Sequence, residues 1–395
     1  MSTGKNIRPF GDIAFFVSGS RPQGGVGQIK EGALSLGGEH VGVDGKLALS
    51  TPKYVPVNYY MANPKGHIKS GDILLCKDGA LSGKVAIECG ELSGLQSMVN
   101  EHVFIIRTDK LDQKYLFYYL FSPIGQRILK GIVTGAAQGG INGKNLKSIP
   151  VVFPDSIAEQ KRIVEELDLL SSVIDKKNEQ LRDLEALAQS IFYEMFGDPV
   201  ANEKGWPVKH LNSVCDVRDG THDSPKYLPQ SDYILITSKN INGDTIDYSN
   251  INYISKEDYD AINRRSRVDE GDIIMAMIGT IGKPVIVHQE GYRFCVKNVA
   301  LIKFPSSAEV TNVYIRALLN SPSYSAFIMS LNKGGTQKFV ALGTLRSLPI
   351  PVPSSAALKD FSERISFVEK QAKIIKQSIA ELNTLRSNRM FQYFV

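Results

Sequence analysis

The stretch Asp155–Gly197 reads DSIAEQKRIVEELDLLSSVIDKKNEQLRDLEALAQSIFYEMFG and predicts one long helix in the middle of the chain. Ser156 and Glu159 form an S-x-x-E capping box, in which each side chain satisfies a free backbone N–H group of the first turn. Gly197 is a typical left-handed stop, and Pro199 cannot continue a helix. At 1.5 Å per residue, a helix of this length extends roughly 60 Å.

Apolar residues recur along this helix at alternating steps of four and three, interrupted only by Lys177, which is the spacing of a coiled coil. A second seam with the same spacing lies near the C-terminus, shifted by 198 residues. A seam this narrow needs a partner helix, so the sequence predicts that helices at 155–197 and 354–395 pair. The residues that we expect to pair are Leu170, Ile174, Leu181, Leu184 and Ile191 in the first helix and Val368, Ile375, Ile379 and Leu382 in the second.

The charges of the two predicted helices favour this pairing. Residues 155–196 contain five basic and ten acidic side chains, whereas residues 354–395 contain seven basic and four acidic ones. Opposite charges at the flanking positions of a coiled coil attract each other. The alternative is that each helix is an amphipathic helix packed on its own domain, and the wider apolar face expected of such a helix is missing.

Internal repeats define the architecture. Gly71-Asp72-Ile73-Leu74 returns as Gly271-Asp272-Ile273-Ile274, and Leu146-Lys147-Ser148-Ile149-Pro150 returns as Leu345-Arg346-Ser347-Leu348-Pro349. The chain is therefore a tandem duplication, with globular domains at 1–154 and 198–353 and helices at 155–197 and 354–395.

Each globular domain has a mixed pattern. We expect strands at Val103–Ile106, Tyr233–Ile236, Ile273–Met277 and Val285–Val287, short helices at Lys114–Phe121 and Val313–Leu319, and loops at Gly131–Gly143 and Asn332–Gly335. The predicted fold class is α+β. Two mixed α/β domains are separated by two long antiparallel helices that form a coiled coil, with approximate two-fold symmetry.

Composition excludes several classes of protein. No run of about 18 apolar residues is present, and the first residues do not form a signal peptide, so we expect no membrane association. The four cysteines are far apart and lack C-x-x-C spacing, which is typical of reduced thiols in a cytoplasmic protein and argues against a zinc site. The net charge is +5, and residues 1–154 contain 17 basic against 11 acidic side chains, a surplus that suits nucleic acid.

Sequence patterns that resemble catalytic sites lack residues that the chemistry requires. Gly79–Lys84 resembles a phosphate-binding P-loop but is one residue short, and Val85 stands where Ser or Thr would hold magnesium. No methyl-donor loop accompanies a D/N-P-P-Y/F motif, and the six histidines show neither triad nor metal-ligand spacing. We therefore expect no catalytic residue and no metal site.

The order of these duplicated motifs resembles the specificity subunits of Type I restriction-modification enzymes. The carrying features are the repeated G-D-I strand, the Gly-rich loop that follows it, the L-[KR]-S-[IL]-P segment and the helix that starts after Pro154. The family usually has Asn-Gln-His after the Gly-rich loop. This chain has Asn100-Glu101-His102 in the first repeat and Asn298-Val299-Ala300 in the second.

This resemblance implies a non-catalytic subunit with two target recognition domains, each reading half of a split, asymmetric site in double-stranded DNA. It further implies that the helices act as a ruler and dock two methyltransferase subunits, which bind S-adenosylmethionine, so that this chain needs no cofactor of its own. A motor-nuclease subunit joins for cleavage. The alternatives are a stand-alone nuclease or methyltransferase, and a scaffold that does not read DNA.

Candidate DNA-binding residues follow from residue type, because base edges and phosphates are contacted by Arg, Lys, Asn and Gln. We expect them in loops near the Gly-rich segments. They are Arg21, Lys77, Lys84, Gln138, Asn142 and Lys144 in the first repeat and Lys239, Asn240, Lys283, Gln337 and Lys338 in the second. Lys84 is expected to meet a DNA phosphate.

Overall fold

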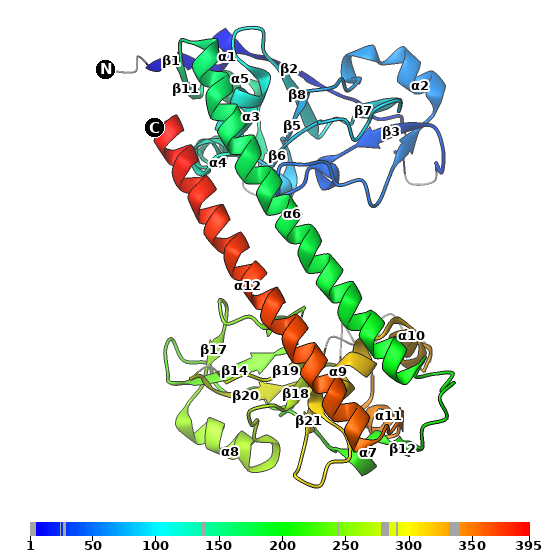
Figure 1. Cartoon of the computed structure of the whole chain (residues 1–395). Helices are drawn as coiled ribbons and strands as arrows, with labels where there is room; N and C mark the ends of the chain where they lie inside the picture. The colour runs from blue at the N-terminus through cyan, green and yellow to red at the C-terminus, as the bar shows by residue number, and fades with distance from the viewer. Residues whose placement is uncertain are drawn as a thin grey trace. The chain divides into compact units, whose positions relative to one another are not determined.

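The computed structural model describes residues 5–23, 25–26, 29–135, 139–243, 245–277, 284–289, 291–331 and 340–395. Contacts divide the chain into unit 1, Met1–Asn178 with Gln377–Val395, and unit 2, Glu179–Lys376. The helices α6 (Ile157–Phe196) and α12 (Ser355–Phe394) each contribute one part to unit 1 and the other to unit 2 (Figure 1). No helix in the described ranges has the length and apolar character to span a membrane.

Unit 1 contains two main sheets. One is antiparallel, in the order β2-β8-β5-β6, and the other has the order β4-β3-β7 with β3 and β7 parallel. The elements are β1 Lys5–Pro9, α1 Phe10–Ile13, β2 Phe15–Ser18, β3 Ala33–Leu36, η1 Gly38–His40, β4 Tyr54–Val55, α2 Val57–Ala62, η2 Pro64–Gly66, β5 Ile73–Cys76, η3 Gly79–Leu81, β6 Val85–Ile87, β7 Ser97–Val99, β8 Val103–Arg107, α3 Gln113–Phe121, α4 Pro123–Gly131, β9 Val133–Thr134, β10 Gly140–Ile141, α5 Gly143–Ser148 and β11 Pro150–Pro154.

Unit 2 repeats this plan with sheets β13-β21-β18-β19 and β17-β14-β20. Its elements are β12 Val208–His210, α7 Leu211–Val214, β13 Asp216–Asp219, β14 Tyr233–Thr237, η4 Ser238–Asn240, β15 Ile241–Asn242, β16 Thr245–Ile246, β17 Asn252–Tyr253, α8 Lys256–Ser266, β18 Ile273–Ala276, β19 Val285–Ile286, β20 Arg293–Lys297, β21 Val299–Lys303, α9 Asn312–Asn320, α10 Pro322–Ser330, α11 Leu342–Arg346 and β22 Pro349–Pro351. The first and last strands of each repeat also pair, β1 with β11 and β12 with β22.

Each unit has a core that includes both long helices. In unit 1, the core contains Leu167 from the first part of α6 and Phe394 from the end of α12, and Phe394 packs edge-on against Tyr115 at 5.4 Å between ring centroids. In unit 2, Phe196 from the end of α6 packs against Phe361 from the start of α12 at 5.0 Å. Burial of such aromatic side chains is the largest favourable contribution to a core of this kind.

All nine residues predicted to pair between the helices are buried or partly buried. Ile174 and Val368 are both buried, with 6% of their surface exposed. The partly buried ones are Leu170, Leu181, Leu184, Ile191, Ile375, Ile379 and Leu382.

Two local predictions need correction. Glu159 N donates to Ser156 Oγ at 3.4 Å, but the Glu159 carboxylate binds Arg162 at 2.8 and 2.9 Å, so the capping box is one-sided. The segment Gly131–Gly143 was predicted as a loop, yet its described part contains the strand pair β9–β10, because the buried Ile141 pairs with Val133. The predicted loop at Asn332–Gly335 lies outside the described residues.

Candidate nucleic-acid interface

The repeated Gly-Asp-Ile motif stabilises the fold and does not form a reading surface. Asp72 is 3% exposed, accepts from the backbone N of Lys69 at 2.7 Å, and forms a bidentate ion pair with Arg107 at 2.6 Å. In unit 2, Asp272 is 5% exposed and pairs with Lys303 at 2.5 Å. A buried carboxylate needs such a partner, since an unpaired one is costly to desolvate.

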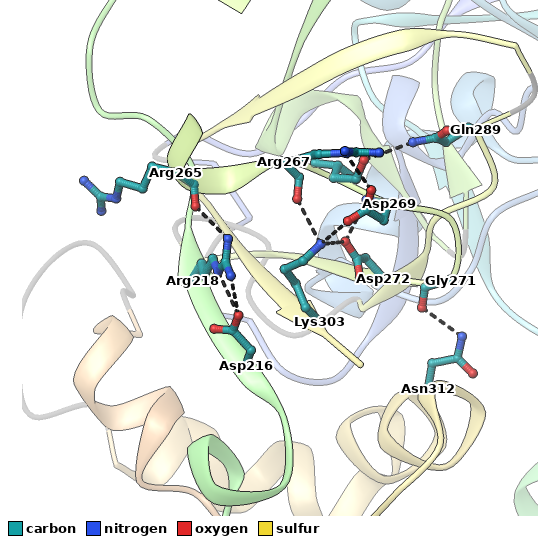
Figure 2. A network of polar contacts seen from close by, with 11 residues as sticks. Asp216, Arg218, Arg265, Arg267, Asp269, Gly271, Asp272, Gln289, Lys303 and Asn312 are labelled. Carbon is teal, nitrogen blue, oxygen red and sulfur yellow. Dashed lines mark hydrogen bonds and ion pairs between the residues drawn. The ribbon is translucent and has the colours of Figure 1, made fainter. Parts of the chain in front are cut away.

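The pair in unit 2 belongs to a larger polar network (Figure 2). Lys303 Nζ also contacts Asp269 at 2.8 Å and the carbonyl oxygen of Arg267 at 3.0 Å. Arg218 on β13 donates to the carbonyl oxygen of Arg265 at 3.0 Å. These bonds join the C-terminal end of α8 to strands β13 and β21. The Arg265 side chain itself points away from the network (Figure 2) and is 68% exposed.

A glycine after the first strand of each four-stranded sheet allows two chain segments to cross closely. A Cβ atom on Gly19 would lie 1.7 Å from the carbonyl oxygen of Val99, and one on Gly220 would lie 2.4 Å from that of Val296. Neither position can accommodate a side chain without movement of the backbone. The crossing brings the residues after each glycine beside the connection between β7 and β8, or between β20 and β21.

In unit 2 this crossing forms a polar cluster that we call cluster 2, made of Asp219, His222, Arg265, Lys297 and Asn298. His222 Nδ1 lies 3.0 Å from Asn298 Oδ1, and His222 Nε2 lies 2.9 Å from Asp219 Oδ2. Asp219 also pairs with Arg265. Lys297 Nζ contacts Ser224 Oγ at 2.5 Å. His222 is 62% exposed, so the cluster lies on the surface.

The electrostatics of cluster 2 favour a charged histidine. Both ring nitrogens of His222 lie within hydrogen-bond distance of side-chain oxygens, an arrangement that favours the doubly protonated ring. The hydrogen bonds with Asn298 and Asp219 raise the pKa of His222. Burial raises the pKa of Asp219, but hydrogen bonds from Arg265 and His222 outweigh it and leave that pKa lowered. The cluster thus carries a surplus of positive charge, which suits a phosphate backbone.

In unit 1 the equivalent crossing forms cluster 1, made of Arg21, Lys77, Asp78, Glu101 and His102. Arg21 Nε lies 2.5 Å from Glu101 Oε1, and His102 lies 3.3 Å from Glu101 and 3.2 Å from Asp78. Lys77 Nζ lies 4.9 Å from the centroid of the Phe104 ring, a cation–π contact. Cluster 1 contains two carboxylates where cluster 2 contains one. The two repeats therefore present different chemistry at the same place in the fold.

Some of the predicted DNA-binding residues gather around cluster 1. Arg21 and Lys77 belong to it. Ile141 N donates to the carbonyl oxygen of Lys77 at 2.7 Å, which places the exposed Asn142 and Lys144 beside it. Asn142 Oδ1 caps α5 by accepting a hydrogen bond from Asn145 N at 2.8 Å, and the amide nitrogen of Asn142 can still donate to a ligand.

The remaining predicted residues separate. Lys84 lies apart from cluster 1, in a cleft beside α4 and α12. Lys239 is exposed on η4, but Asn240 is 4% exposed and its amide binds the backbone of Thr237, Asp247 and Asn250 at 2.9 to 3.2 Å. Asn240 therefore has a role inside the fold. Gln138, Lys283, Gln337 and Lys338 lie outside the described residues.

Sequence reasoning did not predict His222, Arg265, Lys297 or Asn298 as DNA-binding residues. The alignment of Asn298 with Asn100 in the repeat was the available signal. The left-handed φ of +55° at Asn298 and the approach of His222 depend on tertiary structure. Among the residues that the structure describes, no group of three or more His, Cys, Asp or Glu side chains could hold a metal ion.

Comparison with known proteins shows the family of the chain. A family model described as the Type I restriction modification DNA specificity domain matches residues 58–186 and 203–384. The MjaIX specificity subunit of a Type I restriction enzyme from Methanocaldococcus jannaschii is 26% identical over 337 residues, which are 78% of this chain and 74% of that protein. The EcoBI specificity subunit from Escherichia coli is 20% identical over 380 residues, 85% of this chain and 76% of that protein.

The fold also has a solved counterpart. The crystal structure of a Type I restriction-modification system S subunit from M. genitalium aligns with a TM-score of 0.54 at 13% identity, covering 100% of this chain and 97% of that chain. At this identity the likeness concerns the fold alone.

Proposed function

Because the chain belongs to the family of Type I restriction-modification DNA specificity subunits, whose function is DNA sequence recognition, we propose that its two repeats read the two halves of a bipartite, asymmetric site in double-stranded DNA. The target recognition domains would be residues 1–154 and 198–353. The observation that carries this proposal is the equivalence of clusters 1 and 2. Each follows the glycine crossing of its repeat, yet their residue types differ, as two different half-sites require.

We further propose that α6 and α12 pair antiparallel as a coiled coil, with approximate two-fold symmetry between the repeats. The core contents of each unit support this direction. The unit 1 core contains Ile163 and Leu167 of α6 with Met390 and Phe394 of α12, and the unit 2 core contains the opposite ends of the same helices. Such a pair would act as a ruler for the unread bases between the half-sites.

The long helices also expose apolar residues at repeat-equivalent positions. Leu169 and Phe367, which are 198 residues apart, are 64% and 65% exposed. Leu187 and Leu385, again 198 residues apart, are 47% and 43% exposed. Each unit therefore presents one position of each kind, Leu169 with Leu385 in unit 1 and Phe367 with Leu187 in unit 2.

Two equivalent apolar surfaces suit two copies of one partner. We propose that the partners are two methyltransferase subunits, which supply S-adenosylmethionine and the methylation chemistry, and that a motor-nuclease subunit joins them. In this proposal the chain itself is a non-catalytic, cytoplasmic subunit.

The test is to separate the half-sites by mutation. The chain would be co-expressed with its methyltransferase, and the methylated motif determined for the double variants Arg21→Ala/Asn142→Ala in unit 1 and His222→Ala/Arg265→Ala in unit 2. We expect the first to relax base preference in one half-site and the second in the other. Lys161→Ala, on the exposed face of α6, is the control and should leave both halves intact. Relaxation of both halves by one variant would contradict the assignment of one repeat to each half.

A further inference from the structure

A cleft in unit 1 gathers two cations and no carboxylate. Its volume is about 330 Å³, and its lining includes Lys84 beside β6, Phe121 and Gln126 from α3 and α4, and Arg386 and Met390 from α12. Helix α4 lies next to the C-terminal part of α12 (Figure 1). Phe121 and Met390 supply apolar surface to the cleft that Lys84 and Arg386 also line.

Arg386 is half-buried without an acidic partner. Its guanidinium donates to Ser171 Oγ at 3.2 Å and to Asn383 Oδ1 at 3.0 Å, and lies 5.6 Å from the centroid of Phe121. No ion pair joins it to a carboxylate anywhere in the described part of the chain. Burial lowers the pKa of Arg386. A charge held in this way is expensive unless a counter-charge arrives.

Two carboxylates whose charges act on Arg386 have hydrogen-bond partners of their own. Asp175 pairs with Lys46 Nζ at 2.5 Å, and Asp44 Oδ1 accepts from the backbone N of Lys46 at 3.2 Å. Both attract the Arg386 charge from a distance, but neither lines the cleft. Neither carboxylate forms an ion pair with Arg386 in the described residues, so the guanidinium can still bind an anionic ligand.

Lys84 is held in place by its backbone. Cys76 N donates to the Lys84 carbonyl oxygen at 2.9 Å, and Lys84 N donates to that of Leu81 at 3.1 Å. Within the described ranges, no carboxylate or hydrogen-bond acceptor engages its ammonium group. The amide nitrogen of Gln126 donates to the carbonyl oxygens of Gly83 and Leu120, both at 2.9 Å. Lys84 and Arg386 are therefore the donors in the lining of the cleft that can bind an anion.

The cleft is not part of the duplicated plan. The position 198 residues before Arg386 is Ala188, so unit 2 has no equivalent of this guanidinium. A feature needed equally by both repeats would be expected in both, which separates this cleft from the paired apolar surfaces of the long helices.

We propose that the cleft binds a phosphate group through Lys84 and Arg386. The planar guanidinium suits bidentate contact with two phosphate oxygens, and the ammonium supplies a point charge. Apolar walls would accept the organic part of a phosphate ester. That phosphate belongs either to a free ester such as a mononucleotide or to the DNA backbone; the latter source rests on the proposed function.

Calorimetric titration of the full chain with inorganic phosphate, adenosine monophosphate and a 30-base-pair duplex tests this site. The variants are Arg386→Met and Lys84→Met, and the control is Arg389→Met, since Arg389 pairs with Glu166 at 3.1 Å on the same helix. We expect each cleft variant to weaken binding about tenfold, and the control to leave it unchanged.

The probes distinguish the two sources. Weaker binding of phosphate and mononucleotide identifies a free ester. Weaker binding of the duplex alone, with the salt slope reduced by about one per variant, identifies the DNA backbone. Unchanged binding of all three probes in both cleft variants overturns the proposal.

Thermal unfolding distinguishes loss of phosphate binding from loss of folding in the variants. At the same phosphate concentration the Tm of the wild-type chain and of Arg389→Met should rise by more than that of Arg386→Met, because a ligand stabilises the folded state in proportion to how tightly it binds. Arg386→Lys retains the charge and should keep part of the effect. None of these variants should change the methylated motif, so failure of the proposed DNA reading would appear separately as a chain without any motif.

Discussion

His222 Nδ1 and Asn298 Oδ1 lie 3.0 Å apart, and this contact links two segments that are 76 residues apart in the sequence. Asn298 adopts a left-handed φ of +55°, which turns its amide toward the ring. The other ring nitrogen binds Asp219. The histidine is therefore held between two acceptors at the surface of unit 2.

The raised pKa of His222 predicts a pH-dependent stability of unit 2. A group whose pKa is raised by folding contributes its full stabilisation below its unfolded pKa, about 6.5, and loses it as pH rises through the folded value. The thermal unfolding midpoint should therefore fall between pH 6 and pH 8 by more in the wild type than in His222→Gln. His210→Gln is the control, since its ring contacts the Ser347 carbonyl oxygen.

Removing the Asn298 amide should lower the pKa of His222. Asn298→Gly keeps the left-handed backbone accessible and deletes Oδ1, so the pKa of His222, followed by NMR, should fall toward its ordinary value. Asn298→Ala should lower it equally and cost an additional 1–2 kcal/mol or so, because Ala is strained at positive φ. An unchanged His222 titration in both variants would show that Asn298 does not hold the ring.

The glycine crossings should tolerate no side chain. Gly19→Ala places a Cβ 1.7 Å from the carbonyl oxygen of Val99 and should destabilise the chain by about 2–4 kcal/mol in urea unfolding. Gly131→Ala is the matched control, because nothing lies within 4 Å of its Cβ position. A loss of less than about 0.5 kcal/mol in Gly19→Ala would mean that the segments do not cross as closely as described.

The buried pair Asp272–Lys303 should behave as a coupled unit. Lys303→Met leaves the buried Asp272 carboxylate without its ammonium partner and should cost about 3 kcal/mol. Asp272→Asn should cost less, because Lys303 keeps its ion pair with Asp269. The double variant should recover much of this loss, since two neutral groups need no counter-charge. Additive losses in a double-mutant cycle would argue that the two residues act independently.

The exposed apolar positions on the long helices should control assembly. Leu169→Glu and Phe367→Glu should each release one methyltransferase subunit, and the double variant both, because a buried charge disrupts an apolar interface. Native mass spectrometry of the purified complex gives the stoichiometry. Val200→Glu, at a residue 49% exposed outside the helices, should retain both subunits. Retention of two subunits by the double variant would place the docking surface elsewhere.

Much of the fold was predictable from periodicity and repetition. The stop at Gly197, with φ of +73°, and strands such as β8 and β14 follow from local sequence signals. The candidate site was harder to predict from the sequence. Lys84 and Lys77 look alike in sequence, as basic residues flanking one Gly-rich loop. Only tertiary packing places Lys77 over Phe104 and Lys84 beside Arg386, 302 positions later in the chain.

Asn240 is a residue that the sequence wrongly suggested for DNA binding. Its residue type suits base recognition, yet packing directs its amide to three backbone segments. His222 and Arg265 carry no local signal, because their cluster depends on a chain crossing and on the network that holds the end of α8.

Methylome sequencing of a host that expresses this chain with, and without, its methyltransferase tests whether sequence specificity resides in this chain. We expect a bipartite adenine motif with an unread gap, present only when both proteins are expressed. A motif that appears with the methyltransferase alone would contradict this expectation, because the specificity would then reside outside this chain.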